Sequence, residues 1–398
     1  MKLRTLNQIK NLKNKTVLVR VDYNVAIKHG KLLETERIVR SLETINYLVK
    51  KRAKVILMSH LGSPEGKRVM NLSLKPIAYF LDSQMKKKVI FATDCVGEKV
   101  KSQAKKLKSG QILLLENLRF NPGEEKNDAK FARELAALAD IYVNEAFSVC
   151  HRPHASVSAI TKFLPAYAGF NLANEVENLS KLLKGFKRPA IAIIGGVKIS
   201  TKIKVIENLL KRYDYVLVGG ALANNFFAAQ KVNIGKSVWE KDYLKLTKEL
   251  LKKSDGRLIF PVDVRIANRV KAGTETRSVR IAGLNKMVSK NWQIVDIGPK
   301  TEFYFESFIH KSKTLVWNGP MGVFEIGAFS HGTDFICQKV ASHAKGSAFG
   351  VVGGGETIAV LEKLKLKNWP DFVSTAGGAM LEFLEGKVLP GIRPLVKK

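Results

Sequence analysis

Three consecutive glycines, Gly353, Gly354 and Gly355, stand between a short apolar run and a helical pattern near the end of the chain. Glycine lets the backbone approach a ligand closely and turn its amides toward it. A helix that begins just after them would direct its free N–H groups and its positive dipole end to the same place. Thr357 can add a hydroxyl to a phosphate, and Glu356 can bind a magnesium ion. A plain N-cap with an acid in the first turn shows the same pattern, so this segment alone leaves both interpretations open.

Two lysines of "GGVKISTKI", Lys198 and Lys202, lie four residues apart, which would place both on one face of the first turn of a helix. Lysines at a helix N-terminus are unfavourable against the dipole, and this conflict indicates an anion bound between them. The glycine–lysine spacing of a Walker A loop is absent. A further segment, "LVWNGPMGVFE", turns after Trp317 and would expose Asn318 and Glu325.

Cationic and hydrogen-bonding side chains follow the expected strands of the first half. They are Arg20, Asp22 and Asn24 in "VRVDYNV", Arg37 in "ETERIVR", His60 in "MSHLGSP", Arg119 in "ENLRF", and His151, Arg152 and His154 in "CHRPH". Arginine forks suit phosphate and carboxylate groups. A single arginine is more often part of a surface ion pair, and a lone histidine is more often a turn residue. Five such segments that can meet at one sheet edge predict a pocket for a small anion.

Neither a Ser-His-Asp nor a Cys-His arrangement stands out, and no dedicated catalytic base does. A hydroxyl acceptor in phosphoryl transfer usually needs a carboxylate that takes its proton, whereas a carboxylate acceptor is already an anionic nucleophile. Catalysis would then rest on positioning and on cations around the migrating phosphoryl group.

Short apolar runs alternate with longer segments of helical period, which predicts parallel sheets covered by helices on both faces. The runs cover residues 15–22, 53–60, 110–117 and 139–147 in the first half, and 190–196, 214–220, 313–319 and 348–355 in the second. The fold class expected is α/β, with two doubly wound, Rossmann-like domains joined by a helix over residues 171–183. All Gly-Gly steps lie in the second half, which favours a nucleotide-binding edge there.

Composition narrows the class of protein further. The length of 398 residues suggests two domains, and an apolar content of 45% predicts a packed core. The net charge of +32 should attract anions, both phosphorylated metabolites and nucleic acid, although the scattered lysines are also typical of solvated helix faces. Three distant cysteines favour a reducing compartment. Without a membrane-length apolar run or a signal-peptide pattern, we expect a cytoplasmic protein that does not contact membranes.

The chain resembles the phosphoglycerate kinase family along nearly its whole length. The matching stretches, in order, are "VRVDYNV", "SHLG", "LLENLRF", "NEAFSVCHR", "GGVKISTKI", "GGALANNFF", "WNGPMGVFE", "GGGET", "STAGGA" and "LEGKVLPG". The resemblance implies a domain over residues 1–170 that binds 3-phosphoglycerate, a domain over 171–380 that binds ATP or ADP with Mg²⁺, and a tail over 381–398 that returns to the first domain. It implies a monomeric kinase of glycolysis that phosphorylates the carboxylate of 3-phosphoglycerate reversibly, giving 1,3-bisphosphoglycerate and ADP.

The motifs carry the family's site residues onto this sequence. The expected phosphoglycerate ligands are Asp22, Asn24, Arg37, His60, Arg119 and Arg152. The expected nucleotide ligands are Lys198, Lys202, Gly219, Gly220, Asn318, Pro320, Val323, Glu325, Gly353, Gly354, Gly355, Glu356 and Thr357. Arg37, Lys198 and Gly355 are the expected catalytic residues, with Lys198 on the migrating phosphoryl group. Glu356 is the expected magnesium ligand.

Some positions depart from the family pattern. Glu356 stands where the family usually has aspartate, so its carboxylate reaches further by roughly 1.5 Å. Ser63 replaces the arginine that usually follows "SHLG", and nearby Lys67 or Arg68 could compensate for the lost cation. Ser148 replaces a glycine.

Two other functions remain open on the sequence. The high positive charge and the departures at Glu356 and Ser63 would also fit a polyanion or nucleic-acid binder with relaxed catalysis; for the kinase, we expect nucleic acid to bind only non-specifically. The altered substrate loop would also fit a kinase that acts on another phosphorylated acid.

Overall fold

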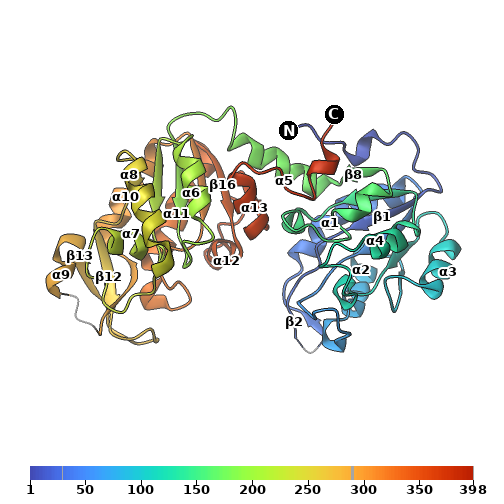
Figure 1. The fold of residues 1–398 in the computed structure, drawn as a ribbon, viewed down its shortest axis with the longest axis horizontal. Helices are drawn as coiled ribbons and strands as arrows, with labels where there is room; N and C mark the ends of the chain where they lie inside the picture. Colours follow the sequence, from blue (N-terminus) through green and yellow to red (C-terminus); the bar gives the residue numbers. More distant parts are fainter. Residues whose placement is uncertain (29, 288–290, 398) are drawn as a thin grey trace. The chain divides into compact units, whose positions relative to one another are not determined.

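The chain forms two compact units in the structure, a computed structural model that describes residues 1–28, 30–287 and 291–397 (Figure 1). Unit 1 comprises Met1–Glu177 together with Val388–Lys398, and unit 2 comprises Asn178–Lys387. Each unit is built around its own six-stranded sheet. The expected pair of parallel-sheet α/β domains is therefore confirmed.

The sheet of unit 1 has the order β5-β6-β4-β1-β7-β8, and every neighbouring pair is parallel. Its strands are β1 (Thr16–Arg20), β4 (Lys54–Met58), β5 (Val89–Phe91), β6 (Ile112–Leu114), β7 (Ile141–Asn144) and β8 (Ala166–Ala168). The helices are α1 (Glu36–Lys50), α2 (Lys75–Met85), α3 (Glu98–Lys106) and α4 (Ala129–Ala136), and α5 (Phe170–Lys181) carries the chain into unit 2. A small hairpin joins β2 (Ile27–Lys28) to β3 (Lys31–Leu32).

The main sheet of unit 2 has the order β11-β10-β9-β15-β16-β17 and is also parallel throughout. Its strands are β9 (Ala190–Ile194), β10 (Tyr215–Val218), β11 (Leu258–Ile259), β15 (Thr314–Asn318), β16 (Phe349–Gly353) and β17 (Phe372–Ser374). The helices are α6 (Ile203–Leu210), α7 (Ala223–Ala229), α8 (Leu244–Lys253), α9 (Leu284–Met287), α10 (Pro299–Lys311), α11 (His331–Gly346), α12 (Gly355–Lys363) and α13 (Gly377–Leu384).

The central strands are apolar because helices cover both faces of each sheet. All five residues of β9 are buried, as are all five of β15, including the indole of Trp317. Every apolar run that predicted a strand does form one. In both sheets the chain leaves a central strand in one direction and returns on its other side, between β1 and β7 in unit 1 and between β9 and β15 in unit 2. Such switch points are where open α/β sheets bind ligands.

A second, three-stranded antiparallel sheet in unit 2 has no counterpart in the sequence prediction. It has the order β13-β12-β14, with β12 (Asp263–Ala267), β13 (Arg277–Arg280) and β14 (Gln293–Ile297). β13 buries only Val279 among four residues, so it lacks the apolar run that marks the other strands. Cross-strand pairing, which the local sequence does not show, stabilises this sheet.

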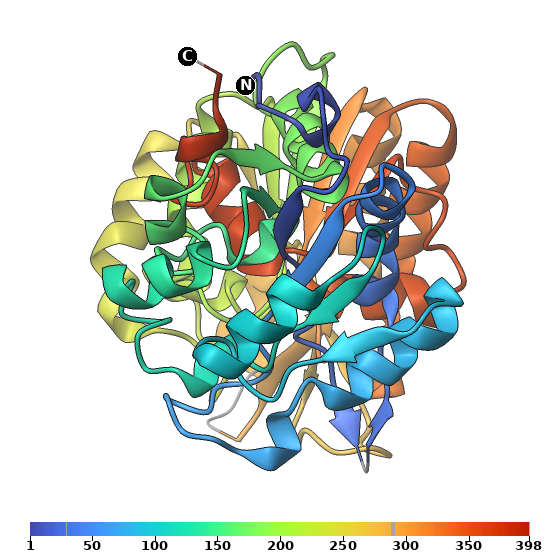
Figure 2. The same cartoon turned by 90° about the vertical axis from the view of Figure 1, so that its right-hand side faces the viewer.

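The last residues of the chain complete unit 1. The backbone of Leu395 accepts a hydrogen bond of 2.7 Å from Arg4, and Gly391 donates one of 2.9 Å to Cys150. Leu389, Ile392 and Leu395 are fully buried. Both views place the two termini side by side in this unit (Figures 1 and 2). The tail is thus part of the core of unit 1.

We predict that Leu395→Ala destabilises unit 1 by about 2–5 kcal/mol, because it removes a fully buried side chain and leaves a cavity. All tryptophans lie between residues 178 and 387, so tryptophan fluorescence reports on unit 2. Urea unfolding followed by circular dichroism should show an earlier transition, while the fluorescence transition stays in place.

The matched control is Leu361→Ala, which removes a leucine of equal burial from unit 2 and should shift the fluorescence transition. A fluorescence shift of equal size in both variants would contradict the assignment of the tail to the core of unit 1.

Candidate active site

Asp22 organises the carboxyl end of the unit 1 sheet. Its carboxylate accepts a hydrogen bond of 3.0 Å from Arg37, in the first turn of α1, and one of 2.6 Å from the hydroxyl of Ser148. Arg37 also donates to the carbonyl of Asn24 at 3.3 Å. These contacts fix residues that follow β1, β3 and β7 in one cluster. Ser148 therefore helps to orient Asp22. A glycine, which the family usually has at this position, could not form this hydrogen bond.

Asn24 and Arg119 are linked through the backbone of Gly62. The N–H of Gly62 donates to the side-chain oxygen of Asn24 at 2.9 Å, and its carbonyl accepts from Arg119 at 2.7 Å. Arg119 is only 3% exposed, and among the described residues its Nη2 has no hydrogen-bond partner. Burial lowers the pKa of this guanidinium. A buried cation with an unused donor is suited to bind an anion.

His60 lies beside Arg20, which is fully buried. Nη2 of Arg20 lies 3.0 Å from Nδ1 of the imidazole, and its Nε donates to the hydroxyl of Ser156 at 3.0 Å. Burial, followed by the charges of Arg20 and Arg119, holds the pKa of His60 well below its ordinary value. The ring is therefore neutral, accepts from Arg20 at Nδ1 and carries its proton on Nε2. Arg20 is not among the phosphoglycerate ligands that the family resemblance implies. Its position at the end of a strand is the sequence feature that marks it as a candidate site residue.

Arg152 and His154 complete the unit 1 edge. Arg152 is exposed and donates from Nε to His151 at 3.2 Å. Burial, together with the nearby arginines, lowers the pKa of His154 to about 4. The charge of Arg152 also lowers the pKa of His60 and of Arg119, so these three groups share one positive field.

Ser63 and Arg68, near the end of "SHLG", have different hydrogen-bond partners. The hydroxyl of Ser63 accepts from Arg119 at 3.2 Å. Arg68 lies 3.8 Å from the carboxylate of Asp94 and donates to the carbonyl of Thr93. Arg68 is therefore held by its own neighbours, while Ser63 helps to orient Arg119.

Glycine backbones form the carboxyl end of the unit 2 sheet. A Cβ atom at Gly195 would lie 2.1 Å from the carbonyl oxygen of Pro320, and one at Gly220 would lie 2.6 Å from the nitrogen of Gly196. Gly220 also has a φ of +66°, which favours glycine. The loops after β9, β10 and β15 thus pack backbone against backbone, and only glycine fits at these contacts.

Lys198 and Lys202 do not share the first turn of a helix, so that part of the prediction is wrong. α6 begins only at Ile203, with Lys202 as its N-cap residue. Ser200 binds both carboxylate oxygens of Glu240, at 2.7 Å and 2.8 Å, so side-chain hydrogen bonds favour a turn over a helix here. Lys202 is buried and donates to the carbonyl of Gly195, whereas Lys198 is exposed.

The ammonium group of Lys202 lies in an environment that disfavours its charge. Burial lowers its pKa to about 8, and the carboxylate of Glu356 partly offsets this effect. A bound phosphate would stabilise the charged form much more directly. A bound anion would therefore stabilise the charged form of Lys202, which its buried environment otherwise disfavours.

Asn318 and Thr357 are buried, contrary to the expected exposure of Asn318. The amide of Asn318 donates to the carbonyl of Gly353 at 2.8 Å, and the hydroxyl of Thr357 accepts from the N–H of Gly319 at 2.8 Å. These hydrogen bonds hold the ends of β15 and β16 in register. Both side chains thus shape the glycine loops.

Gly354 and Gly355 open α12 as the sequence predicts. The helix begins at Gly355, and Gly354 is its N-cap with a φ of +99°. Glu356 lies exposed in the first turn. The amides of this turn therefore face the same edge as Lys202.

The remaining expected nucleotide ligands follow β10 and β15. A Cβ atom at Gly219 would lie 2.4 Å from the sulfur of Met321, so a larger residue there would displace the Met321 side chain. Pro320 is buried, Val323 packs partly buried against Val295 and Phe329, and Glu325 is exposed, as expected. These residues form a partly apolar wall next to the glycine loops.

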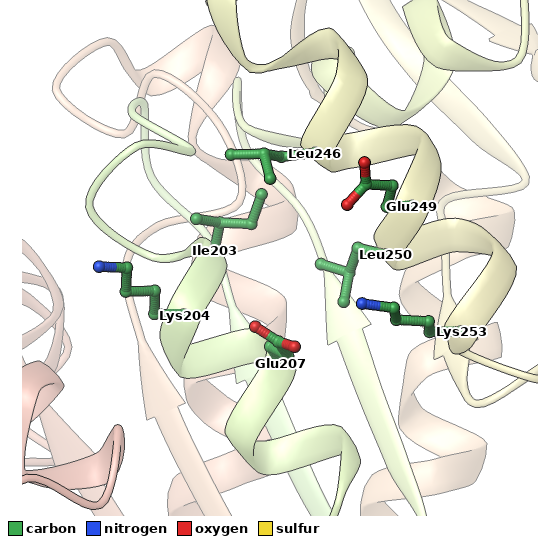
Figure 3. A pocket seen from close by; sticks show the side chains of 7 residues that line it. All are labelled: Ile203, Lys204, Glu207, Leu246, Glu249, Leu250 and Lys253. Atoms are coloured by element: carbon green, nitrogen blue, oxygen red, sulfur yellow. The ribbon is translucent and has the colours of Figure 1, made fainter.

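A separate hollow of about 140 Å³ lies between α6 and α8. Figure 3 shows Ile203, Leu246 and Leu250 pointing toward one another across it. Two lysines and two glutamates surround this apolar floor. The charges of its lining cancel, and it lies between two helices, away from the glycine loops. The hollow is therefore not suited to bind phosphates.

Among the described residues, three or more histidine, cysteine, aspartate or glutamate side chains do not gather anywhere in a group that could hold a metal ion. Mg²⁺, however, usually takes one or two carboxylates and completes its shell with water and substrate phosphates. The single exposed carboxylate of Glu356, close to the helix N-terminus, fits that pattern. A helix long and apolar enough to span a membrane is likewise absent from the part of the chain that the structure describes.

Comparison with known proteins gives consistent matches. The family model described as phosphoglycerate kinase matches residues 6–387. The chain is 46% identical to the phosphoglycerate kinase of Moorella thermoacetica, over 97% of this chain and 98% of the relative. It is also 46% identical to that of Pseudothermotoga lettingae over the full length of both. The solved phosphoglycerate kinase structure from Coxiella burnetii is similar, with a TM-score of 0.87, 40% identity and 99% coverage of both chains.

We predict that replacing Lys202 changes the pH dependence of stability. The pKa is about 8 in the folded state and 10.5 in the unfolded chain, so between these values the unfolded state binds more protons. The free energy of unfolding should therefore rise with pH, by about 2 kcal/mol from about pH 7.5 to 9.5 relative to Lys202→Met. Denaturant titrations at both pH values measure this difference.

The control is Lys198→Met, which removes an exposed lysine from the same turn and should retain the rise. If Lys202→Met showed the same pH dependence as the parent protein, the desolvation of Lys202 would be refuted.

Proposed function

The chain belongs to the phosphoglycerate kinase family, and we propose that unit 1 binds 3-phosphoglycerate while unit 2 binds ATP or ADP. The enzyme transfers a phosphoryl group reversibly between ATP and the carboxylate of 3-phosphoglycerate, giving ADP and 1,3-bisphosphoglycerate. It is thus a phosphotransferase of glycolysis with a carboxyl group as acceptor. The different chemistry of the two sheet edges, guanidinium groups in unit 1 and glycine amides in unit 2, is the observation that supports the assignment of substrates to units.

In unit 1 the acid substrate would bind where buried cations keep unused donors. Arg119 offers its unpartnered Nη2, and His60 offers the N–H at Nε2 that Arg20 enforces. Exposed Arg152 adds a third positively polarised donor. Asp22 and Asn24 would act mainly by orienting Arg37 and Gly62, and their remaining oxygens can accept from the substrate hydroxyl.

In unit 2 the nucleotide phosphates would bind at the glycine loops. The backbone amides of Gly353, Gly354 and Gly355 and the positive end of α12 favour negative charge. Lys202 lies buried at this edge, and exposed Lys198 would contact the migrating phosphoryl group. Gly219, Gly220, Pro320 and Val323 would contact the adenine, and Glu325 the ribose. Asn318 and Thr357 would support these loops from below.

The reaction needs no general base, because the acceptor carboxylate is ionised at neutral pH and attacks as an anion. The protein must then align the two anions and stabilise the charge on the migrating group, for which Lys198, Arg37 and the amide of Gly355 are the proposed groups. Bound Mg²⁺ would neutralise charge on the nucleotide phosphates, with Glu356 as its protein ligand.

The matches favour this kinase over a polyanion binder as the principal function, since the relatives and solved structures above carry the kinase name. Their names also favour 3-phosphoglycerate over another phosphorylated acid. Ser63 stands where the family usually has an arginine. Comparing reaction rates on 3-phosphoglycerate and on other phosphorylated acids would test whether this change alters the substrate preference.

We predict that Lys198→Ala lowers kcat by about 100- to 1,000-fold, because the variant lacks a cation that acts on the migrating group. The dissociation constant of ADP should change by less than about tenfold, since the glycine loops remain. A coupled assay with 3-phosphoglycerate, ATP and Mg²⁺ gives kcat, and calorimetry gives the ADP affinity. Lys204→Ala, which alters an exposed lysine of α6, is the control and should retain the parent kcat; equal rates in all three proteins would refute the role of Lys198.

We further predict that Glu356→Gln raises the Mg²⁺ concentration for half-maximal activity by about tenfold, because a neutral amide is a poor magnesium ligand. Glu356→Asp keeps the charge and should remain within about threefold of the parent. Glu362→Gln removes a carboxylate from the same helix and serves as the control. If Glu356→Gln and Glu362→Gln needed the same Mg²⁺ concentration, Glu356 would not be the ligand.

A further inference from the structure

A basic hollow of about 510 Å³ opens at the amino end of the unit 1 sheet. Its residues precede four adjacent strands in the order β5-β6-β4-β1: Lys87 comes before β5, Ser109 before β6, Arg52 before β4 and Lys13 before β1. All these strands are parallel, so the hollow lies at the edge opposite to Asp22, His60 and Arg119. It is therefore separate from the site described above.

The charge of this hollow has one sign. Lys13, Lys50, Arg52 and Lys87 line it, and the lining contains neither a carboxylate nor an aromatic ring. In the part of the chain that the structure describes, none of these four cations forms an ion pair. Elsewhere on the surface many basic side chains do pair, as Arg188 does with Asp214. The field in the hollow is therefore not cancelled locally and should concentrate anions.

Hydrogen bonds between loops fix the floor of the hollow. The hydroxyl of Ser109 lies 2.7 Å from the side-chain oxygen of Asn14 and 2.7 Å from the carbonyl of Arg52. The N–H of Asn14 donates to the same carbonyl at 3.0 Å. With the Asn14 oxygen turned toward Ser109, its amide NH₂ remains as a further donor. These hydrogen bonds connect the loops that contain Asn14, Arg52 and Ser109. The backbone that carries the cations is therefore held in place.

We propose that this basic hollow binds a compact polyanion with two or more phosphate groups, such as an oligophosphate or a multiply phosphorylated metabolite. The volume lies in the range of small-ligand pockets, roughly 300–1,000 Å³. The three lysines provide point charges, and the arginine provides a guanidinium group whose paired N–H donors suit phosphate oxygens. Without an aromatic ring the hollow has no surface on which nucleobases stack, which favours a compact phosphate ligand over single-stranded nucleic acid. This proposal does not depend on the assignment of substrates to the two units.

Calorimetric titration of the full-length protein with tripolyphosphate tests the proposal, at about 0.15 M salt and with saturating 3-phosphoglycerate and ADP to block the carboxyl edges of both sheets. We expect one site per chain. The triple variant Lys13→Gln/Arg52→Gln/Lys87→Gln should bind about tenfold or more weakly. These side chains are exposed, so the variant should keep the kinase activity and the thermal unfolding of the parent.

The matched control is Lys245→Gln/Lys248→Gln/Lys252→Gln on α8, which removes the same charge from exposed positions of unit 2. It should bind tripolyphosphate within about twofold of the parent. Equal weakening in both variants, or no binding to the parent, would overturn the proposal. A single-stranded RNA oligonucleotide that bound more tightly than tripolyphosphate, and was lost in the hollow variant, would overturn the compact ligand class.

Discussion

The absence of room for a side chain at the edge of the unit 2 sheet is the constraint on which the proposed nucleotide site depends. Gly195, Gly220 and Gly319 bring three loops so close that a Cβ atom on any of them would overlap a backbone atom of a neighbour. At these three positions the backbone, and not a side chain, can face a ligand. The same packing excludes water from Lys202, whose pKa falls to about 8. An anion at this edge would interact with both the backbone amides and the poorly solvated ammonium group of Lys202.

In the proposed function, unit 1 would bind an anion by a different physical route. Its proposed ligands are side chains that hydrogen bonds hold in place, and Nη2 of buried Arg119 has no hydrogen-bond partner among the described residues. Arg20 fixes the tautomer of His60, and Gly62 connects Asn24 with Arg119. Arg119 forms an ion pair of 3.1 Å with Glu125 through Nε, and the substrate would supply the interaction that its buried Nη2 lacks. Two unrelated solutions thus appear on two six-stranded parallel sheets that differ in strand order.

The excess positive charge of the chain is not uniform in its effect. Many lysines lie exposed on helices and loops, where solvent screens them and ion pairs with glutamate occur, as between Lys101 and Glu98. The basic hollow at the amino end of the unit 1 sheet differs because four strand-preceding loops converge there without an acid. Parallel topology produces this convergence, just as it gathers the substrate ligands at the other edge.

The sequence by itself determined the central strands of both parallel sheets, the two-domain α/β architecture and the residue types at both sheet edges, because buried parallel strands and glycine turns leave strong local patterns. The short edge strands β5, β8, β11 and β17 were not predicted. The sequence also did not determine the sheet β13-β12-β14, whose strand Arg277–Arg280 is stabilised by pairing rather than by its own apolar residues. Nor did it show that Lys202 is buried while Lys198 is exposed, or that Asn318 and Thr357 bind neighbouring loops. Burial and hydrogen-bond partners depend on residues distant in the chain, so only the tertiary structure could decide them.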